Sequence, residues 1–439
     1  MGCGQRGCGV ARLRRGAPAR RTPQPTAVGS VGSAMSGPQI TLLVTLTGRD
    51  RPGVTSRLFA ALSAHQLSVL DVEQVVIRGR LVLGVLLSCD DAPDLTTIHR
   101  EVTGLAADLG MDAEITLGTG EPRRRRGSLH VTVLGSPLVP AVIAAIAGRI
   151  AAGGANIDRI GRLAHRPVTC IEFDVSGADP VTLRAALARE SAALGVDIAV
   201  QRGGLHRRAM RLVIMDVDST LLQEEVIDLL AARAGRAAEV AALTSAAMHG
   251  EMDFAAALRQ RVQLLAGLDA AVIGEVLGEL RLAKGARTLV RTLRRLGYRC
   301  GIVSGGFTPV TDWLSAELDL DYAAANTLEI VDGRLTGRVV GPIIDRPGKA
   351  RALREFAAAA GVPLSQTVAV GDGANDLDMI EAAGLGVAFN AKPAVRDAAD
   401  ASVSVPHLDA ILYLLGISRD DIETADAEDA QDAAQARAG

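Results

Sequence analysis

The same order of predicted secondary structure occurs twice in the first half of this 439-residue chain, and this repeat constrains the fold most. Residues 38–120 read as a strand, a helix, two strands, a helix and a strand. Residues 128–203 repeat that order, and an offset of 87 places Gly48 on Gly135. Because the order βαββαβ is the split βαβ plan, each block is predicted to form a ferredoxin-like domain.

The third block, residues 208–417, shows a different pattern, in which short apolar strands alternate with helices. This alternation predicts an α/β domain with a doubly wound parallel sheet, which binds ligands at the carboxyl ends of its strands. Between the first two strands lies a helical insert at about 222–283, which is too long for a simple crossover and is predicted to form a cap. The four predicted strands are LVIMDVD (212–218), RCGIVSGG (299–306), TVAVGDG (367–373) and LGVAFN (385–390).

Both ends of the chain lack the periodicity of packed elements. Residues 1–37 are rich in Arg and Pro without the apolar segment of a signal peptide, and we expect a disordered N-terminal extension. Met35, just before the first predicted strand, is a candidate start of translation. Residues 418–439 are rich in Ala, Asp and Glu, and a frayed or disordered tail is predicted there.

Composition argues against several classes of partner. The net charge of −3 gives no overall attraction to nucleic acid or to a membrane, and no apolar run approaches the roughly 18 residues that span a bilayer. The run Arg123–Arg126 has no interleaved aromatic residues, so a solvated linker is favoured over a nucleic-acid patch. The five cysteines are scattered without a CxxC pair, which indicates a reduced, cytoplasmic protein.

Two predicted strands end in carboxylates. Asp216 and Asp218 stand at i and i+2, so both can face one side of a strand, while Asp372 and Asp376 follow another strand. If the strands are neighbours, the carboxylates repel one another unless a hard cation such as Mg²⁺ compensates them. The alternatives are a helix cap for a single aspartate and a calcium loop, but DVDST lacks the glycine and acidic residue that a calcium loop requires.

Further polar groups suit a phosphate. Ser304 and Gly305 follow an apolar strand, where a hydroxyl and free backbone N–H groups can hold phosphate oxygens. Lys349 stands at a predicted helix start and can neutralise a phosphate, although an ordinary surface lysine is the alternative.

DVDST, SGG, a lysine and GDGAND, in this order, resemble the four motifs of the haloacid dehalogenase superfamily of phosphotransferases. The resemblance implies that Asp216 is a nucleophile that becomes an aspartyl phosphate and that Asp218 is the general acid and base. It also implies that Asp216, Asp218 through its backbone carbonyl, and Asp372 hold Mg²⁺. Ser304 and Lys349 would stabilise the phosphoryl group.

The predicted cap adds a more specific resemblance. LLQEEVIDLLA, directly after the first motif, and MDFAAALRQRVQLL downstream resemble the phosphoserine phosphatase subfamily. The resemblance implies that Glu225 meets the substrate ammonium and Arg261 its carboxylate. A helix-start acid and a solvated helix face are the alternatives for these two residues. The other substrate-binding residues that it implies are Met248, Phe254, Ser304, Gly305, Lys349 and Asn375.

The turn Asp50-Arg51-Pro52-Gly53 after the first strand resembles that of the ACT domain. The resemblance implies sheet pairing, hence a homodimer, and amino acid binding beside the turn, for example of L-serine at Asp50 and Gly53, with Gly135 as a possible further residue of the second block. A tight turn before a helix explains the same residues without a ligand. The second block has GSPLVP instead, so a ligand site there has less support.

The expected function is therefore Mg²⁺-dependent hydrolysis of O-phospho-L-serine to L-serine and phosphate, the last step of serine biosynthesis. Transfer of the phosphoryl group to another acceptor such as homoserine, or action on another phosphoester, is the first alternative. A non-catalytic amino-acid sensor is the second, and the intact set of Asp216, Asp218, Lys349 and Asp372 argues against it.

Overall fold

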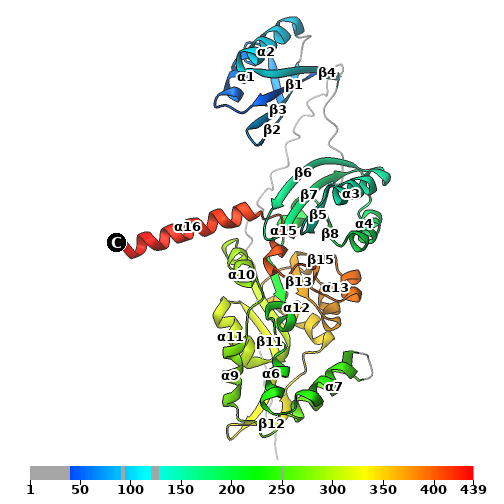
Figure 1. Ribbon diagram of the computed structural model, residues 1–439, viewed down its shortest axis with the longest axis vertical. Coiled ribbons are helices and arrows are strands. Elements are labelled where there is room, and N and C mark those ends of the chain that lie inside the picture. The colour runs from blue at the N-terminus through cyan, green and yellow to red at the C-terminus, as the bar shows by residue number, and fades with distance from the viewer. Residues whose placement is uncertain (1–39, 90–93, 120–127, 249–251, 439) are drawn as a thin grey trace, which may run out of the picture. The chain divides into compact units, whose positions relative to one another are not determined.

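The computed structural model describes residues 40–89, 94–119, 128–248 and 252–438. These residues form two four-stranded antiparallel sheets and one seven-stranded sheet (Figure 1). The proposed N-terminal extension and the run Arg123–Arg126 lie outside the described residues. No helix in the described ranges has the length and apolar character needed to cross a membrane.

The first antiparallel sheet has the predicted βαββαβ order, with strands arranged β2-β3-β1-β4. The turn between β2 and β3 is tight because Arg78 and Gly79 both take positive φ, at 47° and 74°. β2 is an edge strand, and every residue after its first is exposed. The elements are β1 (Ile40–Arg49), α1 (Val54–Leu62), β2 (Leu67–Ile77), β3 (Arg80–Cys89), α2 (Leu95–Leu109) and β4 (Met111–Thr119).

The second antiparallel sheet repeats this plan with the order β6-β7-β5-β8, which confirms the predicted duplication of the fold. In both domains the central strand, β1 or β5, pairs with the last strand and with the second strand of the hairpin. The elements are β5 (Leu129–Gly135), α3 (Pro140–Ala152), β6 (Asn156–Ala164), β7 (Thr169–Ser176), α4 (Pro180–Leu194) and β8 (Asp197–Arg202).

The seven-stranded sheet has the order β12-β11-β10-β9-β13-β14-β15, and only β12 is antiparallel to its neighbour. The four predicted strands correspond to β9, β10, β13 and β14, so the doubly wound parallel sheet is confirmed. The strands are β9 (Leu212–Met215), β10 (Arg299–Phe307), β11 (Tyr322–Val331), β12 (Arg334–Val340), β13 (Thr367–Gly371), β14 (Leu385–Phe389) and β15 (Ala401–Val403).

Helices cover both faces of this sheet because its central strands are apolar on both sides. Val213 and Met215 of β9 pack in one core with α10 (Ala286–Arg295) and α11 (Thr308–Leu318). Leu212 and Ile214 pack in another core with α12 (Arg346–Ala359) and α13 (Leu377–Ala382). Between β9 and α10 lie α6 (Val226–Arg233), α7 (Ala237–Met248), α8 (Phe254–Gln263) and α9 (Ala271–Glu279), which form the predicted helical insert.

The second βαββαβ domain is joined to the parallel-sheet domain by buried and polar contacts. Leu134 and Cys170 belong to the same apolar core as the strands of the parallel sheet. Buried Arg207 pairs with Glu172 on β7 and donates to the backbone carbonyls of Tyr413 (2.7 Å) and Leu414 (2.8 Å). These contacts lie within one compact unit, residues 125–439.

The C-terminal segment differs from the sequence prediction of a frayed or disordered tail. Residues Arg419–Ala438 form one helix, α16, which projects from the domain (Figure 1). Its first turns are held by buried Ile422 and by ion pairs from Arg291 and Arg295 of α10 to Asp426. These partners are more than 130 residues away in sequence, so local periodicity could not indicate them.

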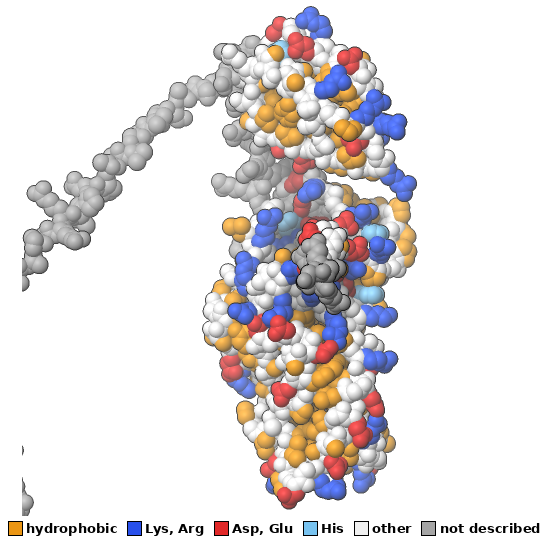
Figure 2. Space-filling view, turned by 90° about the vertical axis from the view of Figure 1, so that its left-hand side faces the viewer, with side chains coloured by type: hydrophobic (Ala, Val, Ile, Leu, Met, Phe, Trp, Pro, Cys, Tyr) orange, Lys and Arg blue, Asp and Glu red, His pale blue; other side chains and the backbone are white. Residues whose placement is uncertain are grey.

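Charged and apolar side chains are interspersed over the surface drawn in Figure 2, without a continuous field of one sign. This agrees with the low net charge of −3. Most of the large exposed apolar residues described in the first βαββαβ domain lie on its edge strand: Val69, Leu70, Val72, Val75, Val76 and Ile77. Leu43, Val82 and Leu117 lie on the other three strands.

Candidate active site

The predicted site residues meet at the carboxyl edge of the parallel sheet. β9 lies between β10 and β13, so Asp216 after β9, Ser304 near the end of β10 and Asp372 after β13 come from adjacent strands. The backbone N–H of Asp216 still donates to Val370 O of β13 at 2.9 Å. The nucleophile candidate is therefore held by the sheet itself.

Asp218 reaches the site by a turn and not by strand alternation, since β9 ends at Met215, which differs from the predicted i, i+2 arrangement on one strand. Residues 217–221 form a helical turn in which Ser219 takes φ 60°. Asp218 Oδ1 accepts from the N–H of Val226 at 3.0 Å and Oδ2 accepts from Ser304 Oγ at 3.1 Å. These two hydrogen bonds hold the Asp218 carboxylate toward Ser304 of β10, so a turn replaces the strand pattern after Met215.

A buried lysine compensates the carboxylates. Lys349, in the first turn of α12, donates from Nζ to Asp216 and, at 2.7 Å, to Asp376. Asp376 is fully buried, and it also accepts from the N–H of Gly373 at 3.0 Å. Gly371 permits this packing, because a Cβ there would lie 2.4 Å from the Asp376 carboxyl carbon. The sequence predicts that Asp376 lies with the other carboxylates, four residues after Asp372, but it does not predict the pairing with Lys349.

Three carboxylates at this edge fit a divalent cation. One oxygen each of Asp216, Asp372 and Asp376 lie within 4.8 Å of one another. Burial, and next the charge of Asp376, raise the pKa of Asp216 well above its usual value, and the same two causes raise the pKa of Asp372 to about 6. Oxygen ligands this close together are the donor set that a hard cation prefers, and Lys349 offsets their mutual repulsion only in part, since the pKa values of Asp216 and Asp372 stay raised.

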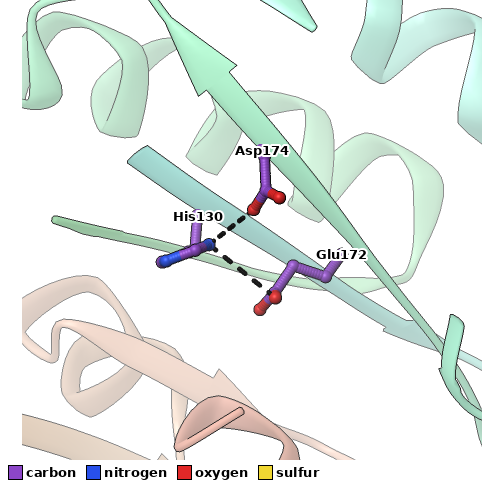
Figure 3. A group of neighbouring side chains, drawn as sticks. All are labelled: His130, Glu172 and Asp174. Carbon is purple, nitrogen blue, oxygen red and sulfur yellow. Dashed lines mark hydrogen bonds and ion pairs between the residues drawn. The ribbon is translucent and has the colours of Figure 1, made fainter. Parts of the chain in front are cut away.

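Another group of possible metal ligands lies in the second βαββαβ domain. His130 on β5 points toward Asp174 and Glu172 on β7 (Figure 3), with Nδ1 2.7 Å from Asp174 and 3.7 Å from Glu172. Glu172 is also paired with Arg207. These side chains are thus engaged in an ion-pair network next to the contact with the parallel-sheet domain.

Two charged residues from the helical insert face the site. Glu225 immediately precedes α6 and accepts from Ser219 Oγ at 2.9 Å. Although the residue as a whole is exposed, loss of hydration around its carboxylate, and next the charge of Asp218, raise its pKa to about 7. Arg261 of α8 is 8% exposed, and its Nη1 donates to Thr244 Oγ1 at 3.3 Å. Arg261 Nε is buried without a partner in the described structure. A buried guanidinium with an unused donor is suited to an anionic ligand group.

The remaining predicted substrate residues are placed as follows. Phe254 begins α8 and lies against Gly305, since a Cβ on Gly305 would be 3.1 Å from the Phe254 ring. Asn375 is half-buried beside Asp376. Met248 ends α7, but its side chain lies outside what the structure describes.

The predicted regulatory residues fall in two different environments. Asp50 and Gly53 border a cavity of about 450 Å³ at the turn before α1, and Gly53 needs its φ of 92° there. Gly135, in contrast, is packed against a neighbour, since a Cβ there would lie 2.7 Å from Leu138. Gly48, which the offset of 87 places on Gly135, is packed in the same way, since a Cβ there would lie 2.6 Å from Met111. Gly135 therefore corresponds to the packed Gly48 and not to the turn at Gly53.

Comparison with protein families agrees with this architecture. Residues 213–381 match the family model of haloacid dehalogenase-like hydrolases, and residues 40–116 and 128–201 each match a model of the ACT domain. The chain is 62% identical over 387 residues to a phosphoserine phosphatase of Streptomyces coelicolor, covering 88% of this chain and 94% of the relative. This protein belongs to the phosphoserine phosphatase family of haloacid dehalogenase-like hydrolases.

Two other similar proteins support the same assignment. Phosphoserine phosphatase SerB2 of Mycobacterium tuberculosis is 54% identical over 395 residues, covering 89% of this chain and 97% of the relative. A solved structure of a probable phosphoserine phosphatase from Vibrio cholerae is 34% identical with a TM-score of 0.53, covering 67% of this chain and 88% of that chain.

Proposed function

We propose that this enzyme hydrolyses O-phospho-L-serine to L-serine and phosphate, as the last step of serine biosynthesis. The observation that carries the proposal is the buried pair of Asp216 and Lys349 at the carboxyl edge of the sheet, next to Asp218 and Ser304. Relatives named phosphoserine phosphatase, with 62% and 54% identity, support the choice of substrate.

In the proposed reaction, a carboxylate oxygen of Asp216 attacks phosphorus as the bond from phosphorus to the ester oxygen breaks. Asp218 gives its proton to that leaving oxygen and so releases L-serine. Burial raises the pKa of Asp218, which favours the protonated form that this step needs. Asp218 then takes a proton from a water molecule while the oxygen of that water attacks phosphorus. The bond between phosphorus and the Asp216 oxygen breaks, which releases phosphate and restores the Asp216 carboxylate.

The other polar groups bind the phosphoryl oxygens and the cation. Lys349 supplies a fixed positive charge, since the charges of Asp216 and Asp376 outweigh burial and keep its pKa above its usual value. Ser304 Oγ accepts from the N–H of Gly306 at 2.7 Å, which orients the hydroxyl. Asp216, Asp372 and the backbone carbonyl of Asp218 would hold Mg²⁺, which when bound offsets negative charge on the phosphate.

The helical insert supplies the recognition of a zwitterion. Glu225 would meet the ammonium group and Arg261 the carboxylate of the substrate, with Phe254, Met248 and Asn375 completing the pocket. The unpartnered Nε of buried Arg261 supports its role, because an unused buried donor is costly until a ligand accepts from it.

A panel of phosphoesters tests the proposal. Phosphate release is measured with O-phospho-L-serine, O-phosphoethanolamine and sugar phosphates, each with Mg²⁺ and with chelator, and with homoserine added as an acceptor. We expect a clear preference for O-phospho-L-serine and loss of turnover without the cation. Preference for a sugar phosphate contradicts the proposed substrate, phosphorylation of homoserine supports the transferase alternative, and no turnover at all supports the sensor alternative.

We also propose that an amino acid, such as L-serine, binds at the cavity beside Asp50 and Gly53 and regulates activity. Calorimetric titration and activity assays with L-serine compare wild-type protein with Gly53→Ala. Identical responses would remove this site.

The homodimer expected from the ACT domains has support in the exposed edge strand β2, and light scattering of the full chain tests it. Cytoplasmic location stays a prediction.

A further inference from the structure

The ladder between β10 and β11 is interrupted where it passes the phosphate-binding residues. Gly301, Ile302 and Val303 pair with residues 322–324, and pairing resumes only at Phe307 and Asn326. Ser304, Gly305 and Gly306 therefore form a bulge at this edge of the sheet, in which the N–H of Gly306 donates to Ser304 Oγ at 2.7 Å. The bulge also takes the half-buried Gly305 carbonyl out of the ladder with β11, so this carbonyl requires another donor.

Asn326 on β11 supplies that donor. Its side chain is fully buried, and Nδ2 donates to Gly305 O at 2.8 Å. The other end of the same amide, Oδ1, accepts from the N–H of Ile344 at 2.8 Å. Both bonds have the short geometry of well-formed hydrogen bonds, so the amide is held at both ends.

The second bond reaches the segment that positions Lys349. Ile344 directly precedes Asp345, whose side chain accepts from the N–H of Gly348 at 2.8 Å and begins α12. The N–H of Lys349 donates to Asp345 O at 2.8 Å. A single amide thus ties the Ser304–Gly306 bulge to the start of the helix that carries the lysine. These are the two segments that would hold the phosphoryl group from different sides.

We propose that Asn326 is a positioning residue for the phosphate cradle, which rests on the proposed phosphatase function. Its amide donates to the Gly305 carbonyl in the bulge and accepts from the N–H of Ile344 before α12. An aliphatic side chain can form neither bond, and an ionised carboxylate can form only the bond to Ile344. Asn326 does not itself contact the substrate. It sets the distance between the bulge and Lys349, and a displacement of about 1 Å at such a site can cost about 100-fold in rate.

The test replaces Asn326 by leucine, which has a similar volume and no hydrogen bonds. The matched control is Thr367→Val at the opposite end of the sheet. Thr367 is also fully buried and also bonds two backbone groups, Leu364 O at 2.8 Å and the N–H of Gly384 at 3.4 Å. Thermal unfolding and steady-state kinetics with O-phospho-L-serine are measured on the full chain of each variant.

We expect both variants to unfold at a lower temperature, but only Asn326→Leu to lose kcat, by about 10- to 100-fold. Equal kcat in Asn326→Leu and Thr367→Val would overturn the inference, because Asn326 would then serve stability alone. Wild-type protein without turnover would contradict the proposed function instead, so the two failures are distinguishable.

Asn326→Asp provides an independent test of the positioning role of Asn326, and this test still applies if Asn326→Leu does not fold. An ionised carboxylate cannot donate to Gly305 O, whereas its protonated form can. We expect kcat of this variant, divided by that of wild type at the same pH, to rise as the pH falls. A ratio that stays at one across the pH range contradicts the positioning role.

Discussion

The ammonium group of Lys349 lies 2.7 Å from Oδ1 of Asp376, and both side chains are fully buried. The same ammonium donates to Asp216. One cation is therefore shared between the proposed nucleophile and a neighbouring carboxylate that faces the same edge of the sheet. Removing the Lys349 ammonium group leaves buried negative charges without compensation, which strongly lowers the free energy of unfolding.

Lys349→Met is therefore expected to lower kcat by at least about 1000-fold and to destabilise the metal-free protein by about 3–5 kcal/mol. Kinetics and urea unfolding in chelator measure the two effects. Lys284→Met is the control, since Lys284 is exposed just after the helical insert. If Lys349→Met were as stable as the control, the lysine would not be compensating the carboxylates.

Asp216→Asn is expected to lose turnover while still binding O-phospho-L-serine, because the amide is not a nucleophile but keeps the shape of the site. It should also raise the unfolding temperature of the metal-free protein, because the repulsion between Asp216 and Asp376 disappears. Phosphate release, calorimetric titration and thermal unfolding measure the three effects. Turnover within tenfold of wild type would exclude Asp216 as the nucleophile.

Substitutions of Arg261 and Glu225 are expected to change KM for two phosphoesters in different ways. Arg261→Met should raise KM for O-phospho-L-serine by about 10- to 100-fold, but leave KM for O-phosphoethanolamine unchanged, since that compound has no carboxylate. Glu225→Gln should raise KM for both compounds, because both carry an ammonium group. Equal effects of Arg261→Met on the two substrates would contradict the assigned carboxylate contact.

Asp197 links the second ACT domain to the parallel-sheet domain by accepting from the N–H of Ser404 at 2.7 Å and from its hydroxyl at 2.8 Å. Burial raises the pKa of Asp197 above its usual value despite these bonds. The folded state therefore holds this proton to a higher pH than the unfolded state does. The contribution of Asp197 to stability is largest below its ordinary pKa and falls as the pH rises through the raised pKa.

Asp197→Asn should remove this dependence, because an amide does not titrate. Urea unfolding of both proteins from acid to neutral pH measures the difference in the free energy of unfolding. We expect wild type to lose stability relative to Asp197→Asn as the pH rises. A constant difference across this range would show that Asp197 does not titrate with a raised pKa.

Much of the fold was predictable because its signals are local. Alternation of apolar residues and the turn residues at Arg78 and Gly79 indicate strands and hairpins over a few positions. The order of DVDST, SGG, lysine and GDGAND can likewise be read from the sequence alone, since each motif is a short segment at a strand or helix end. Asp218 shows the limit, because a turn at Ser219 replaced the expected strand geometry.

The sequence by itself determined the element order, the duplicated domain and the residues proposed to carry phosphoryl chemistry. Only the tertiary structure decided which groups pair: Lys349 with Asp376, Asn326 with Gly305 and Ile344, and the arginines of α10 with α16. These pairs join side chains to partners on other elements, from 18 to more than 130 residues away. Their geometry depends on how sheets and helices pack, and local periodicity carries no record of that packing.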